Sequence, residues 1–237
     1  MSTEWAPKRF WSEVAVETAG SGFELRLDGR PVRTPGKSPL AMPTERMAEA
    51  AAAEWRAVDE RIDPAAMPVT RSANSAVDKV APQKGAVADY LAEYGATDLL
   101  CYRAEAPEAL AEIQSARWDP LLGWAEERFG ARLRLAVGVM PVEQDPDALA
   151  RLRAPLDSAD PFALTAIHDL VSLPGSLVVG LAAAEGHMSP EELWSVQRID
   201  EDWNEGLWGV DEEAAERDAR RRQAFLHAHR FLDLARR

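Results

Sequence analysis

The chain has 237 residues, of which 46% are hydrophobic and 28% charged, and it carries a formal net charge of −13. These proportions are typical of a globular protein, and no apolar run reaches the roughly 18 residues that a membrane span requires. The negative charge argues against nucleic acid and anionic membranes as partners, because both are bound by dense cationic surfaces. We therefore expect neither as a partner.

The first eleven residues, MSTEWAPKRFW, lack the apolar core of a secretory signal and the arginine- and serine-rich pattern of a transit peptide. The expected location is the cytoplasm. The single cysteine, Cys101, excludes an intramolecular disulfide and a CxxC motif. We expect its thiol to be buried and unreactive.

Residues 12–35 predict a β-meander. In SEVAVET, Val14 and Val16 alternate with polar neighbours, GSG supplies a turn, and FELRLDG repeats the alternation. Thr44 then precedes the alanine-rich stretch ERMAEAAAAEWRAVDE, which has high helix propensity. Thr44 is therefore the predicted N-cap of a helix.

Beyond RIDPAAMP, proline and glycine separate segments with helical periodicity. The expected helices lie at about residues 70–80, 82–94, 107–129, 145–153, 160–172, 176–185, 189–207 and 211–235. Residues 132–139 are an exception, because their alternating leucines and valines predict a strand whose partner is not evident. We predict an α+β protein, with a small β-containing N-terminal domain over residues 1–75 and a larger, mostly helical domain over 76–237.

Two short motifs suggest a known site but fail on spacing. PGKSP contains Gly-Lys-Ser, but Pro31 stands where a phosphate-binding loop needs its first glycine. Asp200, Asp202 and Asn204 match positions 1, 3 and 5 of a calcium loop, but the glycine and glutamate required at positions 6 and 12 are missing. No catalytic trio is recognisable, so we expect no catalytic residue, no metal and no other cofactor.

Residues 198–217 contain eight carboxylates and two tryptophans. On one continuous helix over 189–207, a first side carries the residues spaced to face a core, namely Val196, Ile199, Trp203 and Leu207. The opposite side gathers Trp194, Glu201, Glu205 and Trp208. That mixed side is either buried by other helices or a docking surface, and both interpretations stay open from the sequence.

Six longer blocks in the same order carry a more specific signal. They are LDGRPVRTPGKSPLAMPT, AAEWRAVDERIDPAAMPVTRSANSAVDKV, GATDLLCYRAE, RWDPLLGWAEERFGARL, PGSLVVGLA and DEDWNEGLWGVDEEAAER. Together they resemble the family of F1-ATPase assembly chaperones that bind the unassembled alpha subunit, over about residues 10–232. The resemblance implies the same order of domains, a non-enzymatic role and no nucleotide or metal. It also implies that the protein covers the beta-facing surface of its client, the F1 alpha subunit, until the hexamer forms.

The resemblance also points to functional residues. The family's Glu-Trp pair corresponds to Glu54 and Trp55, and its acidic tryptophan block to residues 200–213. There the family commonly has W-Q-x-E-x-W-G, whereas this chain has Gly206 at the glutamate position, which leaves Glu205 or Glu201 to take that role. The expected client-binding residues are Trp194, Glu201, Glu205 and Trp208, with Trp55, Asp200 and Asp202 in support.

We thus expect a monomeric cytoplasmic chaperone of the F1 alpha subunit. An alternative from another class is a metal-binding protein or enzyme that uses the carboxylates of residues 200–213. Self-assembly through the helical domain is a third option that the sequence leaves open.

Overall fold

The computed structural model describes residues 7–20 and 22–236. They form two compact units. The first unit contains the described residues up to Lys84, together with Asp160–Ala166 and those from Arg230 onward, and the second contains Gly85–Ala159 and Ile167–His229. In contrast to the division at residue 75 expected from the sequence, these units are not consecutive, because helices α6 (Pro161–Ser172) and α10 (Glu212–Ala235) supply residues to both.

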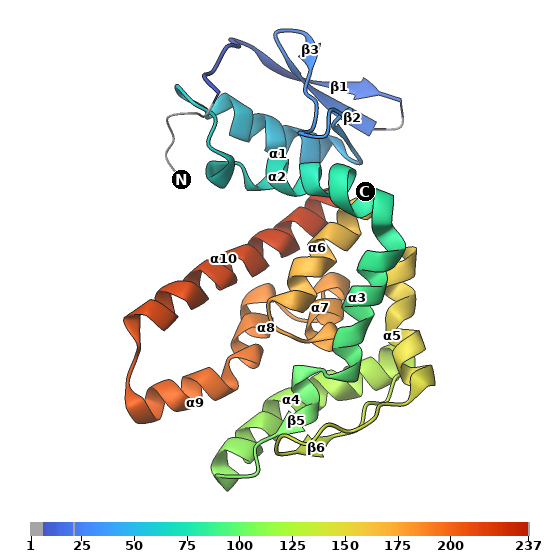
Figure 1. The fold of residues 1–237 in the computed structure, drawn as a ribbon, viewed down its shortest axis with the longest axis vertical. Coiled ribbons are helices and arrows are strands. Elements are labelled where there is room, and N and C mark those ends of the chain that lie inside the picture. The colour runs from blue at the N-terminus through green and yellow to red at the C-terminus, as the bar shows by residue number, and fades with distance from the viewer. Residues whose placement is uncertain (1–6, 21, 237) are drawn as a thin grey trace. The chain divides into compact units, whose positions relative to one another are not determined.

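The strands of the first unit form the expected meander (Figure 1). They are β1 (Val14–Ala19), β2 (Gly22–Leu27), β3 (Arg30–Pro31) and β4 (Ala41–Met42), and β2 pairs antiparallel with each of the others. The turn from β2 to β3 has positive φ at both central residues, Asp28 and Gly29, as in the Asp-Gly turns that suit a twisted hairpin. The predicted α+β class is confirmed, since helices make up most of the remaining chain.

Helix α1 (Glu45–Arg56) covers this sheet with its alanine-rich side. The Thr44 hydroxyl accepts a hydrogen bond from the Met47 N–H at 3.1 Å, which confirms the predicted N-cap. Short helices follow, namely η2 (Pro64–Ala66), α2 (Pro68–Ser75), one π-helical turn η3 (Ala76–Val80) and η4 (Ala81–Gln83). The helix expected at 70–80 is therefore two elements, the first of which begins at Pro68.

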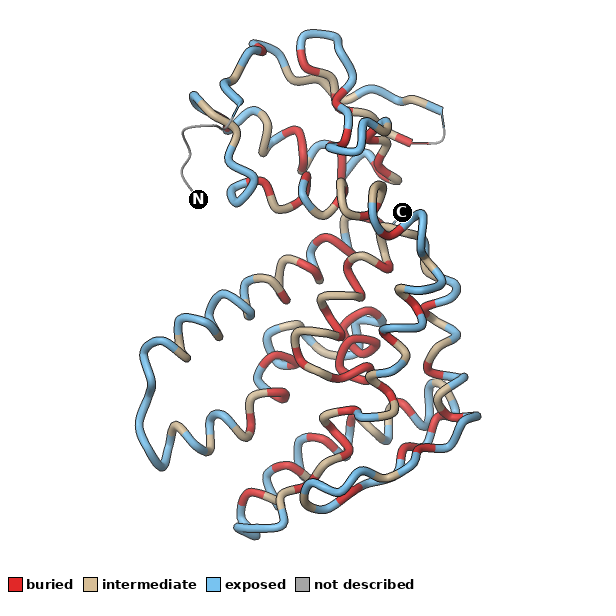
Figure 2. The backbone as a smooth tube through the Cα atoms, viewed as in Figure 1, coloured by how far each residue is buried: buried red, intermediate tan, exposed pale blue. Residues whose placement is uncertain are grey.

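The second unit is built around α7 (Leu177–Glu185), whose residues 177–184 are all buried. Its neighbours include α4 (Glu108–Phe129), α5 (Pro146–Ser158) and α8 (Pro190–Gln197), and α3 (Lys84–Ala96) contributes buried residues to the same unit. Figure 2 shows α7 as an almost unbroken buried segment. A helix that is apolar all round is expected to be central, because it has no polar side to offer to water. None of the described helices is long and apolar enough to cross a membrane.

The carboxylate of Asp98 fixes the beginning of α7. It accepts hydrogen bonds from the Ser176 hydroxyl at 2.7 Å, the Val178 N–H at 3.0 Å and the Leu100 N–H at 3.0 Å. Burial raises the pKa of Asp98 to about 6, although these hydrogen bonds act in the opposite direction. Cys101, in the adjoining turn η5 (Leu99–Cys101), is buried as expected, and burial raises the pKa of its thiol to about 12.

The predicted strand at 132–139 is only partly correct. Its ladder is limited to β6 (Ala136–Val137), which pairs in parallel with β5 (Tyr102–Arg103). Upstream of β6, the Gln144 side chain takes the place of a strand partner. Its oxygen accepts from the Arg134 N–H at 2.8 Å, and its amide nitrogen donates to the Arg134 carbonyl at 2.9 Å. The segment that contains the alternating residues is therefore a strand only at Ala136 and Val137. At Arg134, a side-chain amide and not a neighbouring strand satisfies the backbone N–H and carbonyl.

The single helix predicted at 189–207 is wrong. The structure has α8 followed by α9 (Ile199–Trp208), and the two are separated at Arg198, whose φ of −94° and ψ of 7° are not helical. Gly209 ends α9 with a φ of +85°, a conformation that favours glycine. Helix α5 also differs from its prediction, because it continues through Pro155 to Ser158 instead of ending at 153.

Candidate functional site

Helix α4 provides the base on which α8 and α9 rest. The Trp118 side chain is fully buried, and its Nε1 donates to the Val196 carbonyl at the end of α8 at 2.8 Å. One turn earlier, the buried Gln114 side chain connects two segments. Its oxygen accepts from the Ala104 N–H at 2.8 Å, and its nitrogen donates to Asp200 Oδ1 at 2.6 Å. The bond to Asp200 holds the first turn of α9 against α4, and the bond from Ala104 holds the segment after β5 against the same helix.

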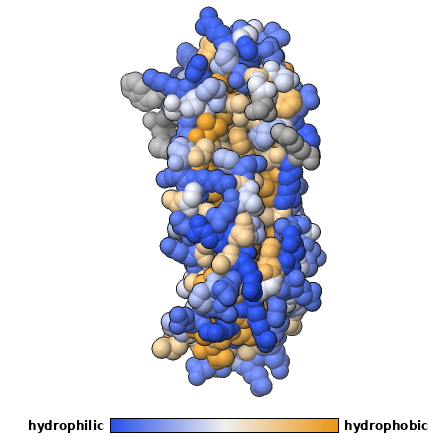
Figure 3. All heavy atoms as spheres, turned by 90° about the vertical axis from the view of Figure 1, so that its right-hand side faces the viewer, coloured by the Kyte–Doolittle hydropathy of each residue, from blue (hydrophilic) through white to orange (hydrophobic). Residues whose placement is uncertain are grey.

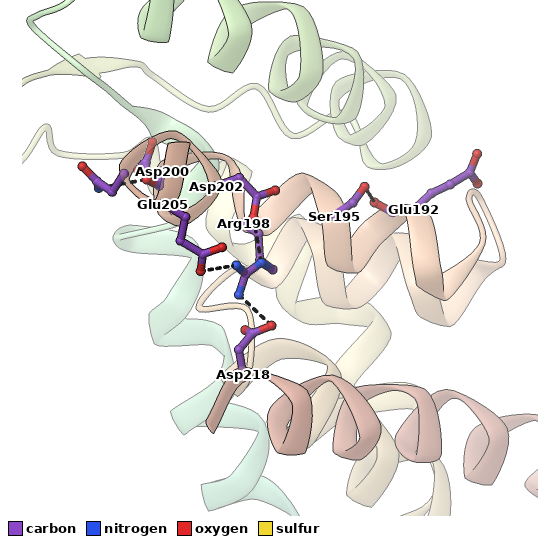
Figure 4. Close-up of polar contacts among 8 residues, drawn as sticks. Glu192, Ser195, Arg198, Asp200, Asp202, Glu205 and Asp218 are labelled. Carbon is purple, nitrogen blue, oxygen red and sulfur yellow. Dashed lines mark hydrogen bonds and ion pairs between the residues drawn. The ribbon is translucent and has the colours of Figure 1, made fainter. Parts of the chain in front are cut away.

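Arg198, at the break between α8 and α9, binds three carboxylates. Its guanidinium contacts Asp202 at 2.9 Å and Glu205 at 2.8 Å on α9, and Asp218 at 2.6 Å on α10. Figure 4 shows the guanidinium between Asp218 on one side and the two α9 acids on the other. Burial lowers the pKa of Arg198, but the hydrogen bonds to Asp218, Glu205 and Asp202 outweigh it and leave the pKa raised. Arg198 therefore links α9 to α10 and is paired with two acids of the predicted site, Asp202 and Glu205.

The four acids of α9 consequently have different surroundings. Asp200 faces α4 through Gln114, whereas Asp202 and Glu205 are paired with Arg198. Glu201 is exposed, and its side chain makes no hydrogen bond or ion pair with a described residue. Of the predicted acids, Glu201 is thus the one whose charge is most available to a partner.

The calcium-like spacing has no loop around it. Asp200, Asp202 and Asn204 all lie within α9, and the Asn204 amide donates to the Asp200 carbonyl along the helix at 2.9 Å. A calcium loop instead wraps its ligands around the ion. Within residues 7–20 and 22–236, no three His, Cys, Asp or Glu side chains are grouped to hold a metal ion. The geometry therefore gives no support to the alternative of a carboxylate metal site.

The end of α9 carries an exposed apolar group of three residues, which we call the α9 tip. The exposed fractions of its side chains are 59% for Leu207, 84% for Trp208 and 64% for Val210. Leu207 was expected in the core stripe, and that prediction is wrong, although Val196 and Ile199 are buried as expected and Trp203 is half-buried. Because the chain is not helical at Arg198, residues of α8 and α9 do not follow one helical repeat. The predicted apolar stripe therefore does not continue from α8 to the end of α9.

Trp194, expected among the client-binding residues, is buried. Only 2% of it is exposed, its ring lies 5.4 Å from that of Phe225 on α10, and the Arg221 guanidinium lies 5.9 Å from its ring centre. The grouping of Trp194 with Trp208 on one open face is therefore wrong. Trp194 packs α8 against α10, whereas Trp208 lies at the far end of α9.

The Glu54–Trp55 pair lies in the first unit. The Glu54 carboxylate accepts hydrogen bonds from the N–H groups of Val69 at 2.7 Å and Thr70 at 2.8 Å, at the start of α2. Trp55 is half-buried and makes an edge contact with Trp11, with ring centres 5.1 Å apart. Glu54 is thus a helix-capping residue, and Trp55 contributes to both the core and the surface of that unit.

Sequence reasoning missed a second exposed apolar group in the second unit. Leu135, Val137, Val139 and Met140, around β6, are all exposed. A groove of about 720 Å³ runs between this segment, α4 and the first turns of α9, and Asp200 and Asn204 line it. Figure 3 turns the view of Figure 1 by 90° about the vertical axis. Apolar patches appear near its lower end, at the level of β5 and β6 in Figure 1. The sequence did contain a signal for this surface, the uncharged apolar run LAVGVM at residues 135–140, but we interpreted its alternation as a strand.

Comparisons with known proteins agree with this fold. The family model described as ATP12 chaperone protein matches residues 8–126. Atp12 from Paracoccus denitrificans is 53% identical, with a TM-score of 0.95 over 98% of this chain and 100% of that one. A point mutant of Atp12p from the same organism is 52% identical, with a TM-score of 0.96 over 99% of this chain and 100% of that one. Protein atp12, mitochondrial, of Schizosaccharomyces pombe is 25% identical over 223 residues, which are 89% of this chain and 77% of that protein.

The fold and these likenesses define a chaperone for ATP synthase assembly. The chain belongs to the ATP12 chaperone family. The resemblance found in the sequence blocks is thereby confirmed, and an F1 subunit is the partner that membership implies.

Proposed function

We propose that this protein binds the unassembled alpha subunit of F1 and covers its beta-facing surface until the hexamer forms. The α9 tip carries the proposal, because it is an exposed apolar group at the end of the helix that also carries the available carboxylate of Glu201. Exposed tryptophan is rare on a surface that meets only water, and it is enriched among residues that dominate binding energy at interfaces. A subunit that has not met its partner exposes such apolar surface and aggregates unless it is covered.

The proposed contact residues are Glu201 and Trp208, with Leu207 and Val210 beside them. Glu205 and Asp202 act through Arg198, since their carboxylates are paired there and set the position of α9. Trp194 supports the same arrangement from inside, through its contact with Phe225. The role is non-enzymatic and the protein acts as a monomer. The S. pombe relative carries the word mitochondrial in its name, whereas for this chain the cytoplasmic location stays a prediction.

The first test uses alpha and beta subunits that are expressed separately. Mixed with this protein, the alpha subunit should scatter less light as it is warmed and should co-elute with the protein from a sizing column. The beta subunit should do neither. Unchanged aggregation of the alpha subunit with no complex would overturn the proposal, and equal binding of beta would overturn its specificity.

The second test locates the surface. Trp208→Ala combined with Glu201→Ala should weaken binding to the alpha subunit at least about tenfold, because an exposed aromatic anchor and its flanking charge are lost. The free energy of unfolding, measured with urea, should change by no more than about 0.5 kcal/mol, the range for surface substitutions. Phe10→Ala with Glu191→Ala removes another exposed aromatic residue, 70% exposed against 84% for Trp208, and another exposed acid, and serves as the control. A large loss of stability in the first variant would show that the tip belongs to the fold and not to an interface.

A further inference from the structure

The first unit contains a groove of about 650 Å³ that plays no part in the proposed α9 surface. It lies among the turn at residues 33–36, the end of α1, η2 and α2. Its apolar wall includes Trp55, Ile62 and Met67, together with three prolines, Pro7, Pro35 and Pro64. A cavity of this size and lining is typical of ligand sites, which range from about 300 to 1,000 Å³.

The wall formed by the turn is held in place by Asp78. Its Oδ1 accepts from the Thr34 hydroxyl at 2.6 Å, and its Oδ2 accepts from the Gly36 N–H at 2.8 Å. A Cβ atom at Gly36 would lie 2.7 Å from Asp78 Oδ1, so any other residue there would force the Asp78 carboxylate to move. The groove is therefore preformed on this side, and both oxygens of the Asp78 carboxylate are already hydrogen-bonded.

Three cations line the same groove, namely Arg33, Arg71 and Lys79. Arg33 donates to the Lys37 carbonyl at 2.8 Å, but none of the three is ion-paired with a described residue. A group of three cations is unusual in this chain, because it has 40 acidic and only 27 basic residues. Unpaired cations around an apolar groove favour an occupant that combines an apolar side chain with carboxylates.

Two polar atoms of the lining also lack partners. Trp55 Nε1, a donor, and Asn74 Oδ1, an acceptor, are both buried without a hydrogen bond, and both side chains line the groove. Buried polar groups in native proteins nearly always find a partner. A peptide group offers both the carbonyl that Trp55 needs and the N–H that Asn74 needs. Because neither atom reaches solvent, the side chains must rotate slightly for these bonds to form.

We propose that this groove binds an extended polypeptide segment in which an apolar side chain lies next to acidic residues. The apolar side chain packs against Trp55, Ile62 and Met67, and the carboxylates meet Arg71 and Lys79. The peptide backbone satisfies Trp55 Nε1 and Asn74 Oδ1. The site is a second binding surface, and it does not depend on the role of the α9 tip.

The experiment titrates the full chain with short blocked peptides and follows the assigned indole N–H signal of Trp55 and the methyl signal of Met67 by NMR. The acidic apolar peptide acetyl-Glu-Phe-Asp-Leu-Glu-amide should shift both signals saturably, and added salt should weaken its binding. Two matched peptides replace either all three acids by lysine or both apolar residues by serine, and neither should saturate. Equal binding of the lysine peptide, or no shift with the acidic one, would overturn the proposal. Phenylacetate that binds as tightly as the acidic peptide would instead indicate a small-molecule site.

Charge reversal separates the groove from a general surface effect. Arg71→Glu with Lys79→Glu should weaken the acidic peptide about tenfold or more, because two attractions become repulsions. Arg46→Glu reverses an exposed charge on α1 that does not line the groove and should leave the affinity within twofold. Unchanged affinity in the double variant, with an unfolding midpoint equal to that of the parent, would contradict the assignment.

Discussion

Arg198 determines what the acidic residues of α9 can do. Read along the sequence, Asp200, Asp202 and Glu205 form one dense negative segment, which suggests a cation site or a charged docking face. In the structure, the guanidinium at the helix break takes two of them and Asp218 as well. Three carboxylates around one half-buried cation satisfy the requirement that a buried charge be paired. Arg198 offsets one unit of this negative charge and fixes the positions of the carboxylates that it binds, so Asp202 and Glu205 are less available to a partner than the sequence suggests.

Asp98 shows how burial acts on a single carboxylate. The group is hydrogen-bonded by Ser176, Val178 and Leu100, yet burial raises its pKa from 3.8 to about 6. In the unfolded chain its pKa returns to the ordinary value, so between about pH 4 and pH 6 the folded state holds more protons than the unfolded state. The contribution of Asp98 to stability therefore falls as the pH rises through that interval and is lost above about pH 7.

This reasoning predicts the pH dependence of Asp98→Asn. Relative to the variant, which does not titrate, the parent protein should gain about 1 kcal/mol of unfolding free energy when the pH is lowered from 7 to 5. Urea unfolding of both proteins at the two pH values measures the difference. A gap that is constant with pH, or that widens toward pH 7, would contradict a raised pKa in the folded state.

At the scale of elements, close helix packing in the second unit depends on a glycine. A Cβ atom at Gly180 of α7 would overlap Val171 Cγ2 and lie 3.1 Å from the Leu170 carbonyl oxygen. Both neighbours belong to the part of α6 that lies in the second unit. The absence of a side chain at Gly180 thus sets how closely α7 approaches α6.

Gly180→Ala should accordingly lower the free energy of unfolding by about 1–3 kcal/mol, the range for an overpacked core. Gly123→Ala in α4 is the matched control, because nothing lies within 4 Å of its Cβ position. There the substitution should raise stability by about 0.5–1 kcal/mol through helix propensity and a less flexible unfolded chain. Denaturant unfolding of both variants is the measurement, and equal effects of the same sign would contradict the packing argument.

At the scale of the whole molecule, the net charge of −13 and the exposed apolar groups have opposite effects on self-association. The α9 tip and the residues around β6 offer surface that favours association. Like charge on every copy opposes the contact of two chains, and salt weakens that opposition.

We predict that the chain sediments as a monomer at low salt over a hundredfold range of concentration. At high salt, any association that appears should decrease in Trp208→Ala. Sedimentation velocity at two salt concentrations tests both statements. A dimer at low salt that survives the substitution would favour self-assembly through another face.

The outcome at particular residues shows how far sequence reasoning extends. Thr44 and the alternation in β1 and β2 were predictable, because capping and strand alternation are local and leave a signal within a few residues. The stripe through Leu207 failed, because the helix is broken at Arg198, whose guanidinium pairs with acids of α9 and α10. Gln144 is similar, since nothing in the sequence announces that its amide replaces a strand partner of Arg134. The sequence placed Trp194 and Trp208 on one side of a single helix, and it could not show that one is buried and the other exposed.

By itself, the sequence determined the α+β class, the helix caps and the family, because these depend on local periodicity and on blocks of residues in register. Only the tertiary structure decided which of the acidic and aromatic residues face solvent. Exposure depends on what lies opposite a side chain. Gln114 on α4 faces Asp200, Arg198 at the helix break pairs with Asp202 and Glu205, and Phe225 on α10 packs against Trp194. Those contacts leave Glu201 and Trp208 exposed and bury Trp194, a division that no helical wheel drawn on one segment contains.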